Sequence, residues 1–200
     1  MQFPWSLIKA MTWHALKCRL TGRRRAPIVL MLEPLFACNL RCEGCGRIRE
    51  YHHVMDQRLS VEECLASAQE CDAPIVSICG GEPLLYPELD RLVNGLIAQG
   101  RHIYLCTNAL LVDRWIDRLP RSSRLTWNIH LDGMEATHDA ITQRPGTFQT
   151  VIQNIRRLKA DGRRVTTNTT IYAQTDMDEI LVLLDYLSEL RIDGMLLSPA

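Results

Sequence analysis

Three cysteines with short, uneven spacing are the residues of this chain best suited to chemistry. Cys38, Cys42 and Cys45 follow a C-x3-C-x2-C pattern, and no fourth cysteine follows close behind. Iron–sulfur clusters are normally held by four cysteine thiolates. Three thiolates can hold three irons of a [4Fe–4S] cluster and leave the fourth iron open, as catalytic metal sites keep one position for a reacting molecule. The spacing therefore indicates chemistry at a cluster rather than electron storage alone.

A structural zinc site and an electron-transfer cluster are the other interpretations of this triplet. Structural zinc takes four ligands, commonly as two C-x2-C pairs. The remaining cysteines lie on unrelated predicted elements and form no second pair: Cys18, Cys64, Cys71, Cys79 and Cys106. The number of neighbouring cysteines, three instead of four, favours a cluster with one open iron. The triplet alone still leaves both alternatives open.

The composition fits one globular domain. The chain has 200 residues, of which 46% are hydrophobic, and 23 basic residues balance 23 acidic ones. This balance gives no support for nucleic-acid binding. Nothing resembling a secretory signal precedes the cysteines, and no apolar run approaches the ~20 residues of a membrane span. We therefore expect a cytoplasmic protein with free or metal-bound thiols, with a peripheral position on the inner face of the membrane as a variant of that placement.

The first 25 residues are locally basic and contain no acidic residue. Helical spacing gives them two apolar stripes, which together hold Leu7, Met11, Ala15 and Cys18 in one and Trp13, Leu16 and Leu20 in the other. A helix packed against the domain is one interpretation, and a helix lying on an anionic membrane surface is the other. We expect residues 1–26 to form a basic helix and loop that precede a core over residues 27–200.

The core alternates between strand and helix patterns. Apolar or β-branched runs predict strands over residues 29–35, 75–78, 103–106, 125–131, 165–171 and 195–197. Amphipathic patterns predict helices over 60–70, 89–99, 110–119, 148–161 and 178–190, the first opened by a capping box of Ser60 and Glu63. Such alternation predicts an α/β fold with a parallel sheet and right-handed crossovers, a partial TIM-type (β/α)6 barrel with an N-terminal helix. A full eight-stranded barrel needs roughly 250 residues, so the core is either an open six-stranded barrel or truncated at its C-terminus. We expect truncation, because a parallel strand needs helical cover.

Polar and glycine-rich residues follow the predicted strands. Active sites of parallel α/β folds lie at the carboxyl ends of the strands, so these residues should meet at one mouth with the cysteine loop. They are Gly80, Gly81, Glu82, Thr107, Asn108, His130, Asp132 and Asn168. The two glycines permit a close backbone approach, although a pair of glycines alone is also an ordinary strand-to-helix turn. Asp132 alone would equally suit a turn before Gly133.

The cysteine triplet after the first strand, together with Gly80-Gly81-Glu82-Pro83 after the second, resembles the radical S-adenosylmethionine (SAM) superfamily. The resemblance implies that the three cysteines hold a [4Fe–4S] cluster and that SAM binds the open iron. It implies that Gly80, Gly81 and Glu82 line the methionine part of SAM, where Glu82 accepts a hydrogen bond from the ammonium. It further implies that the other strand-end residues contact SAM, and that an aromatic residue should precede the third cysteine, where this chain has Gly44.

Within that superfamily the chain is most similar to the adenosylhopane synthases of hopanoid biosynthesis, over PIVLMLEPLFACNLRCEGCG (residues 27–46) and several later segments. This resemblance implies addition of a 5′-deoxyadenosyl radical to the alkene of diploptene, with an electron supplied by a reductant such as ferredoxin or flavodoxin. The carbon radical left after addition needs a hydrogen atom, and we expect Cys106, at the end of the third strand, to donate it. A small buried packing thiol is the simpler interpretation of Cys106.

Other functions stay open at this point. The chain could be a radical SAM enzyme acting on a peptide or nucleotide, a non-enzymatic iron–sulfur or zinc module, or an inactive fragment. A non-enzymatic module would not need Gly80, Gly81, Glu82 or Asn168, and it would not cleave SAM.

Overall fold

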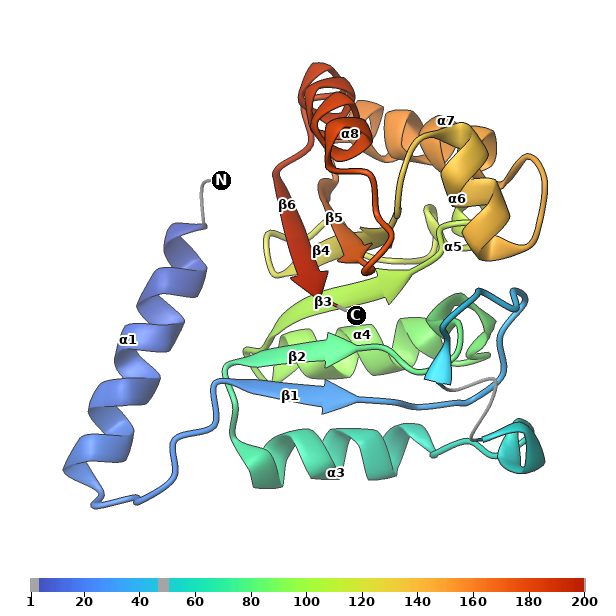
Figure 1. Ribbon diagram of the computed structural model, residues 1–200. Helices are drawn as coiled ribbons and strands as arrows, with labels where there is room; N and C mark the ends of the chain where they lie inside the picture. The colour runs from blue at the N-terminus through green and yellow to red at the C-terminus, as the bar shows by residue number, and fades with distance from the viewer. Residues whose placement is uncertain (1–3, 47–50, 200) are drawn as a thin grey trace.

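A single curled sheet organises the protein (Figure 1). The computed structural model describes residues 4–46 and 51–199. All six strands are parallel and pair in chain order from β1 to β6. The strands are β1 (Val29–Leu32), β2 (Ile75–Ile78), β3 (His102–Thr107), β4 (Leu125–His130), β5 (Arg164–Ile171) and β6 (Gly194–Pro199). The predicted six-stranded parallel α/β half-barrel is therefore confirmed.

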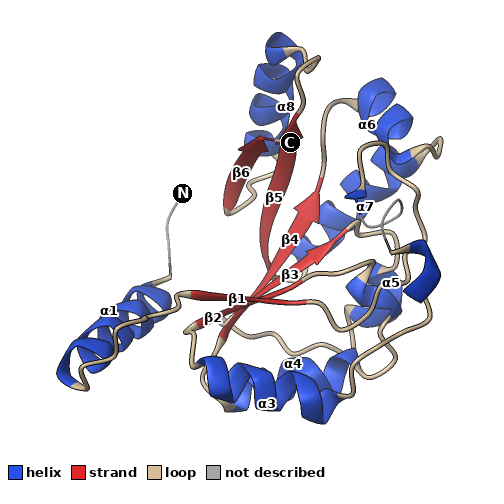
Figure 2. Ribbon diagram, turned by 60° about the horizontal axis from the view of Figure 1, so that its bottom comes forward, coloured by secondary structure: helices blue, strands red, loops and turns tan. Residues whose placement is uncertain are grey.

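Helices cover the convex face of this sheet (Figure 2). They are α3 (Val61–Cys71), α4 (Leu89–Ala98), α5 (Val112–Trp115), α6 (Glu135–Thr142), α7 (Thr147–Ala160) and α8 (Met177–Glu189), with short 3-10 turns η1 (His52–Val54) and η2 (Pro83–Leu85). The core lies between helices and sheet, where Val76, Leu105 and Trp127 are fully buried. Helix α3 begins at the predicted capping box, in which Ser60 and Glu63 satisfy each other's backbone N–H groups.

The structure differs from the expectation in the bounds of two elements and in one additional helix. The helix expected over residues 110–119 shrinks to the single turn of α5, and β1 ends at Leu32 rather than at residue 35. Helix α6 was not expected, because most of its residues are polar and its buried positions include His138 and Thr142. Apolar periodicity, the main signal for a helix, is weak there.

The concave face of the sheet is open and apolar. Val29 is 46% exposed and Met31 62% exposed on β1, and Leu196 is 37% exposed on β6. Helix α1 (Trp5–Leu20) lies beside the amino ends of β1 and β2, at the opposite end of the sheet from the cysteine loop (Figures 1 and 2). Among the described residues, no helix is long and apolar enough to cross a membrane.

Candidate active site

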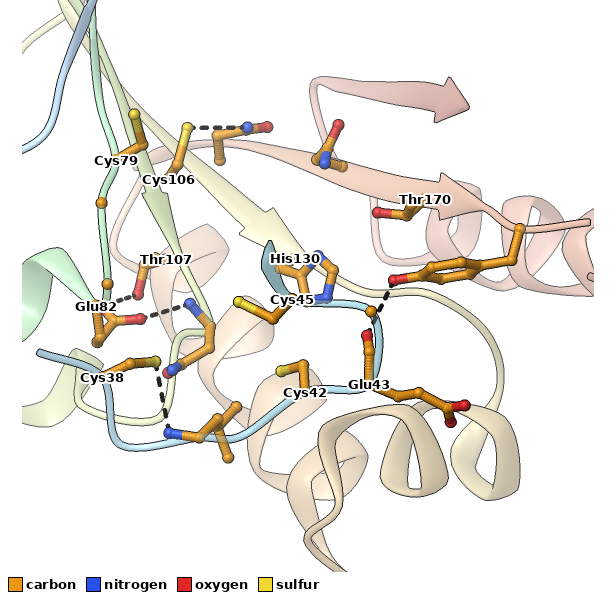
Figure 3. A pocket seen from close by; sticks show the side chains of 18 residues that line it. Cys38, Cys42, Glu43, Cys45, Cys79, Glu82, Cys106, Thr107, His130 and Thr170 are labelled. Atoms are coloured by element: carbon orange, nitrogen blue, oxygen red, sulfur yellow. Dashed lines mark hydrogen bonds between the residues drawn. The ribbon is translucent and has the colours of Figure 1, made fainter. Parts of the chain in front are cut away.

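A pocket of about 430 Å³ lies at the carboxyl ends of the strands and collects nearly all of the predicted site residues (Figure 3). Its walls include all three cysteines of the triplet and most of the strand-end residues. The predicted residues that line it are Cys38, Cys42, Cys45, Gly80, Gly81, Glu82, Cys106, Thr107, Asn108, His130 and Asn168. Segments far apart in sequence thus meet at one mouth, as expected for a parallel α/β fold.

The two glycines bring the loop after β2 against the segment that leads into Cys38. A Cβ atom on Gly81 would lie 2.0 Å from the carbonyl oxygen of Ala37, and Gly80 adopts a φ of +117°. The Gly81 N–H donates to the carbonyl of Leu35 at 3.0 Å, and the Glu82 N–H donates to that of Ala37 at 2.8 Å. The absence of side chains on the two glycines therefore lets two backbone segments approach closely, and this contact positions the cysteine loop. The approach to a ligand stays a prediction.

Glu82 fastens the same loop to the end of β3. Its side chain is buried, with only 1% of the residue exposed. One carboxylate oxygen accepts hydrogen bonds from the Leu84 N–H at 2.9 Å and the Thr107 hydroxyl at 2.6 Å, and the other accepts from the Asn108 N–H at 2.8 Å. Burial raises the pKa of Glu82, while these three donors oppose that rise. A carboxylate has about four acceptor positions, so one remains for a ligand.

Asn108 continues this connection to the cysteine loop. Its side-chain amide donates to the side-chain oxygen Oδ1 of Asn39 at 2.7 Å, and the Leu40 N–H points at the Cys38 sulfur from 3.5 Å. The N–H of Glu43 donates to the carbonyl of Ile141 at 2.7 Å. The first half of the loop is thus held by β3 and the second half by α6.

Asp132 is not among the residues that line the pocket, although its carboxylate lies against His130. Strand β4 ends at His130, so Asp132 lies just beyond the strand. The Asp132 carboxylate is buried, accepts from the Thr170 N–H at 2.7 Å and lies 2.8 Å from His130 Nε2. It therefore orients His130, which lines the pocket.

Besides Cys79 and residues of the cysteine loop itself, the pocket is lined by three residues that the sequence did not predict: Asn128, Thr170 and Tyr172. Asn128 sits two residues before His130 on β4, a spacing that could have revealed it. The Tyr172 ring lies over Gly44, since its Cε1 atom would be 3.1 Å from a Cβ on that glycine. Tyr172 thus brings an aromatic face to the place where the sequence itself lacks one. Little in the sequence indicates that Tyr172 belongs to the site, because it follows β5 as an isolated loop residue.

The Cys106 sulfur is flanked by two polar side chains. Ser77 Oγ lies 3.3 Å away, and the Asn128 amide nitrogen donates to the sulfur at 3.4 Å. The Asn128 carbonyl oxygen accepts from the Thr166 hydroxyl at 2.8 Å, which fixes the direction of the amide. Cys106 and Asn128 are also direct partners in the register of β3 and β4. The thiol is therefore held at a defined place on the pocket wall rather than packed among apolar side chains.

The donor set fits a cluster better than a single metal ion. Cys38, Cys42 and Cys45 face the same cavity (Figure 3), yet among the described residues no three His, Cys, Asp or Glu side chains converge closely enough to hold one ion. A structural zinc requires such convergence, whereas a [4Fe–4S] cluster takes one thiolate on each of three irons. Burial raises the pKa of Cys42 to about 12, and the neighbouring Cys38 and Cys45 add to the rise. Ligation must therefore displace the thiol protons.

Comparisons with known proteins agree with this geometry. Residues 32–187 match the family model described as the Radical SAM superfamily. The GTP 3′,8-cyclase of Synechocystis sp. (strain ATCC 27184 / PCC 6803 / Kazusa) is 30% identical over 156 residues, which cover 74% of this chain and 47% of that protein. The Fe-coproporphyrin III synthase of Methanosarcina barkeri (strain Fusaro / DSM 804) is 26% identical over 78% of this chain and 39% of its own length.

Solved structures share the fold. Streptococcus suis SuiB bound to S-adenosylmethionine superposes with a TM-score of 0.76 at 21% identity, over 94% of this chain and 44% of SuiB. The chain spans about half the length of the curated relatives it matches first. The family match covers most of the chain and includes the cysteine triplet and the Gly80-Gly81-Glu82 loop. The chain therefore belongs to the radical SAM superfamily, whose cofactors are a [4Fe–4S] cluster and SAM.

Proposed function

We propose that this protein is a radical SAM transferase that cleaves SAM at a [4Fe–4S] cluster and adds the 5′-deoxyadenosyl group to the alkene of diploptene, giving adenosylhopane. The observation that carries the proposal is the position of Cys106. Its thiol lies where the polar pocket around the cysteine triplet borders a second, apolar cavity. A hydrogen-atom donor is needed at such a border if the radical attacks an apolar alkene.

The apolar cavity has a volume of about 620 Å³ and lies against the concave face of the sheet. Asn128 lines both cavities, and Ser77, which touches the Cys106 sulfur, lines the apolar one. The apolar residues around it are Leu7, Ile8, Met11, Ile28, Val29, Met31, Ile75, Tyr104 and Leu196. Cavities of this volume and lining suit hydrophobic ligands of moderate size. The lining therefore supports a hydrocarbon substrate.

In this proposal the polar pocket binds the cluster and SAM, and the apolar cavity binds the alkene. The cysteine triplet would hold the cluster, and Tyr172, His130 and the free acceptor position of Glu82 would contact SAM. A reduced cluster bound there would supply the electron for cleavage of SAM into methionine and a 5′-deoxyadenosyl radical.

Cys106 completes the reaction in this proposal. Addition of the adenosyl radical to the terminal alkene carbon forms one C–C bond and leaves an unpaired electron on the adjacent carbon. Cys106 quenches it by giving up the hydrogen atom of its S–H bond. The sulfur radical returns to a thiol by taking one proton and one electron, the latter from a reductant of the ferredoxin or flavodoxin class.

A radical enzyme acting on a nucleotide or a peptide is the second candidate. Similarity to GTP 3′,8-cyclases, and to SuiB, which has also been solved bound to a precursor peptide, favours this class. A nucleotide triphosphate, however, calls for cationic side chains. Within the part of the chain that the structure describes, neither cavity is lined by a lysine or an arginine. This difference is why we place the alkene first.

Replacing Cys106 tests the proposal. We expect Cys106→Ala to form 5′-deoxyadenosine from SAM but to lose or divert adenosylhopane, whereas the wild type in D2O should place one deuterium in the product. Cys79→Ala is the matched control, because Cys79 lines the same pocket outside the triplet. Formation of adenosylhopane by Cys106→Ala at the normal rate and stereochemistry would overturn the role of Cys106. Turnover of GTP or a peptide, with none of diploptene, would favour the second candidate.

A further inference from the structure

Helix α1 has an apolar face that the rest of the protein does not cover. Its inner stripe is buried against the domain at Leu7, His14 and Cys18. The outer face is exposed and carries four large apolar side chains: Trp5 at 77%, Trp13 at 66%, Leu16 at 45% and Leu20 at 75%. At 100° per residue these four lie within an arc of about 80° on the side opposite Leu7. Both apolar stripes of the sequence therefore exist, and only one is used for packing.

The surroundings of this outer face are cationic. Lys9 lies within the arc of these four apolar side chains, Arg19 lies next to that arc on the exposed side of α1, and Arg24 and Arg25 follow in the exposed loop after it. No acidic residue precedes Glu33 in the sequence. An apolar face with two tryptophans and bordering cations matches the chemistry of a phospholipid surface, where the indole rings sit at headgroup level and the cations meet anionic headgroups.

Ion pairs near the C-terminal end of α1 hold this helix against the domain. Lys17 and Arg23 form ion pairs with Asp72 at 2.8 and 2.9 Å, and Arg101 approaches the same carboxylate at 3.2 Å. These contacts fix the end of α1 next to the end of α3 (Figure 1). The exposed outer face lies on the side of α1 opposite its buried stripe. Two of the cations of this segment thus serve the fold, and the others are available to a partner.

We propose that the outer face of α1, made of Trp5, Trp13, Leu16 and Leu20, docks the protein on an anionic lipid bilayer. The helix lies flat in the interface, with its four large side chains in the headgroup region and Lys9, Arg19, Arg24 and Arg25 against lipid phosphates. A second copy of the chain is a less favourable occupant, because two such cationic faces repel each other. The proposal does not rest on the alkene chemistry, although Leu7, Ile8 and Met11 of the same helix border the apolar cavity.

The four tryptophans make a direct probe of this docking. Trp5 and Trp13 are exposed on α1, whereas Trp115 and Trp127 are 4% and 0% exposed in the core. With vesicles of phosphatidylcholine and phosphatidylglycerol, we expect the protein to float with the lipid and its tryptophan emission to shift to shorter wavelength. Pure phosphatidylcholine should give a weaker response, and added salt should reduce binding to the anionic vesicles. A Trp5→Phe/Trp13→Phe variant should still float, but without the emission shift.

Two pairs of matched variants separate the apolar and cationic parts. Trp5→Ser/Trp13→Ser should abolish flotation, whereas Leu181→Ser/Val182→Ser, which removes two similarly exposed apolar side chains from α8, should leave it intact. Arg24→Glu/Arg25→Glu should weaken partition at least about tenfold, because each cation near an anionic surface contributes on the order of 1 kcal/mol. Arg114→Glu/Arg191→Glu makes the same change in net charge at exposed sites away from α1 and should have a much smaller effect.

Three results would overturn the proposal. The first is wild-type protein that stays with neither kind of vesicle. The second is flotation that survives in Trp5→Ser/Trp13→Ser. The third is a concentration-dependent dimer in light scattering that the same variant dissolves, since this would assign the outer face to a second copy. All of these readouts are independent of catalysis, so loss of adenosylhopane formation alone would leave the membrane proposal standing.

Discussion

Replacing Glu82 by glutamine tests how the site is assembled. The buried carboxylate accepts from the Leu84 N–H, the Thr107 hydroxyl and the Asn108 N–H. A glutamine amide offers one oxygen and one NH2 group, so it can keep the two bonds on one oxygen but must turn a donor toward the Asn108 N–H. At least one buried N–H is then left without an acceptor.

The number of buried N–H groups left without an acceptor sets the expected loss in free energy of unfolding. An unsatisfied buried donor costs about 1–3 kcal/mol. The neutral amide also avoids part of the desolvation cost that raises the pKa of Glu82, so we expect Glu82→Gln to lower the free energy of unfolding by about 1–2 kcal/mol. Glu82→Ala removes all three acceptor contacts and should cost more.

Urea unfolding followed by circular dichroism measures this change. The matched control is Glu70→Gln on α3, the same substitution at an exposed carboxylate, where we expect a change within about 0.5 kcal/mol. Calorimetric titration of SAM into the reconstituted variant provides a second readout of the acceptor position that faces the pocket. If Glu82→Gln unfolds at the same urea concentration as the wild type, the carboxylate is not fastening this loop and the reasoning fails.

Two further predictions concern the backbone approach and a buried imidazole. In Gly81→Ala the new Cβ would lie 2.0 Å from the carbonyl oxygen of Ala37, so the cysteine loop must move. We therefore expect reduced iron content after reconstitution and a lower midpoint of urea unfolding. Unchanged values of both would contradict the close approach. Burial, aided by the nearby His130, lowers the pKa of His138 from 6.5 to about 4. The stabilisation from neutral His138 is complete above pH 6.5 and is lost as the pH falls through 4. At 1.36 kcal/mol per pH unit it amounts to about 3 kcal/mol. His138→Gln should therefore flatten the dependence of unfolding free energy on pH between 6.5 and 4, and an unaltered slope would show that His138 is not the titrating group.

The sequence predicted the architecture because its signals are local and repeated. Six apolar runs alternate with amphipathic stretches, and each predicted strand exists in the parallel sheet. The cysteine triplet and the loop around Gly80 and Gly81 could be placed at one mouth because parallel strands end at the same edge. The capping box of Ser60 and Glu63 formed for the same local reason.

Features that depend on how distant segments pack together could not be predicted from the sequence. Asp132 does not line the pocket itself but contacts His130, which does, and this division depends on how the chain leaves β4. The apolar cavity is lined by side chains from α1 and from separate strands, so no contiguous sequence motif predicts it. Tyr172 reaches Gly44 from a loop 128 positions later in the chain, a contact for which the sequence carries no periodic signal. The two stripes of α1 were visible, but only the fold showed which stripe is buried.

Anaerobic turnover of the reconstituted chain tests the central claim most directly. The chain is loaded with iron and sulfide, reduced with dithionite and supplied with SAM, with and without diploptene, and the products are identified by mass spectrometry. We predict SAM cleavage that requires Cys38, Cys42 and Cys45, and adenosylhopane only when diploptene is present. A reduced cluster that leaves SAM intact would contradict the assignment as a SAM-cleaving enzyme. Formation of 5′-deoxyadenosine without any adenosylhopane would contradict the alkene as its substrate.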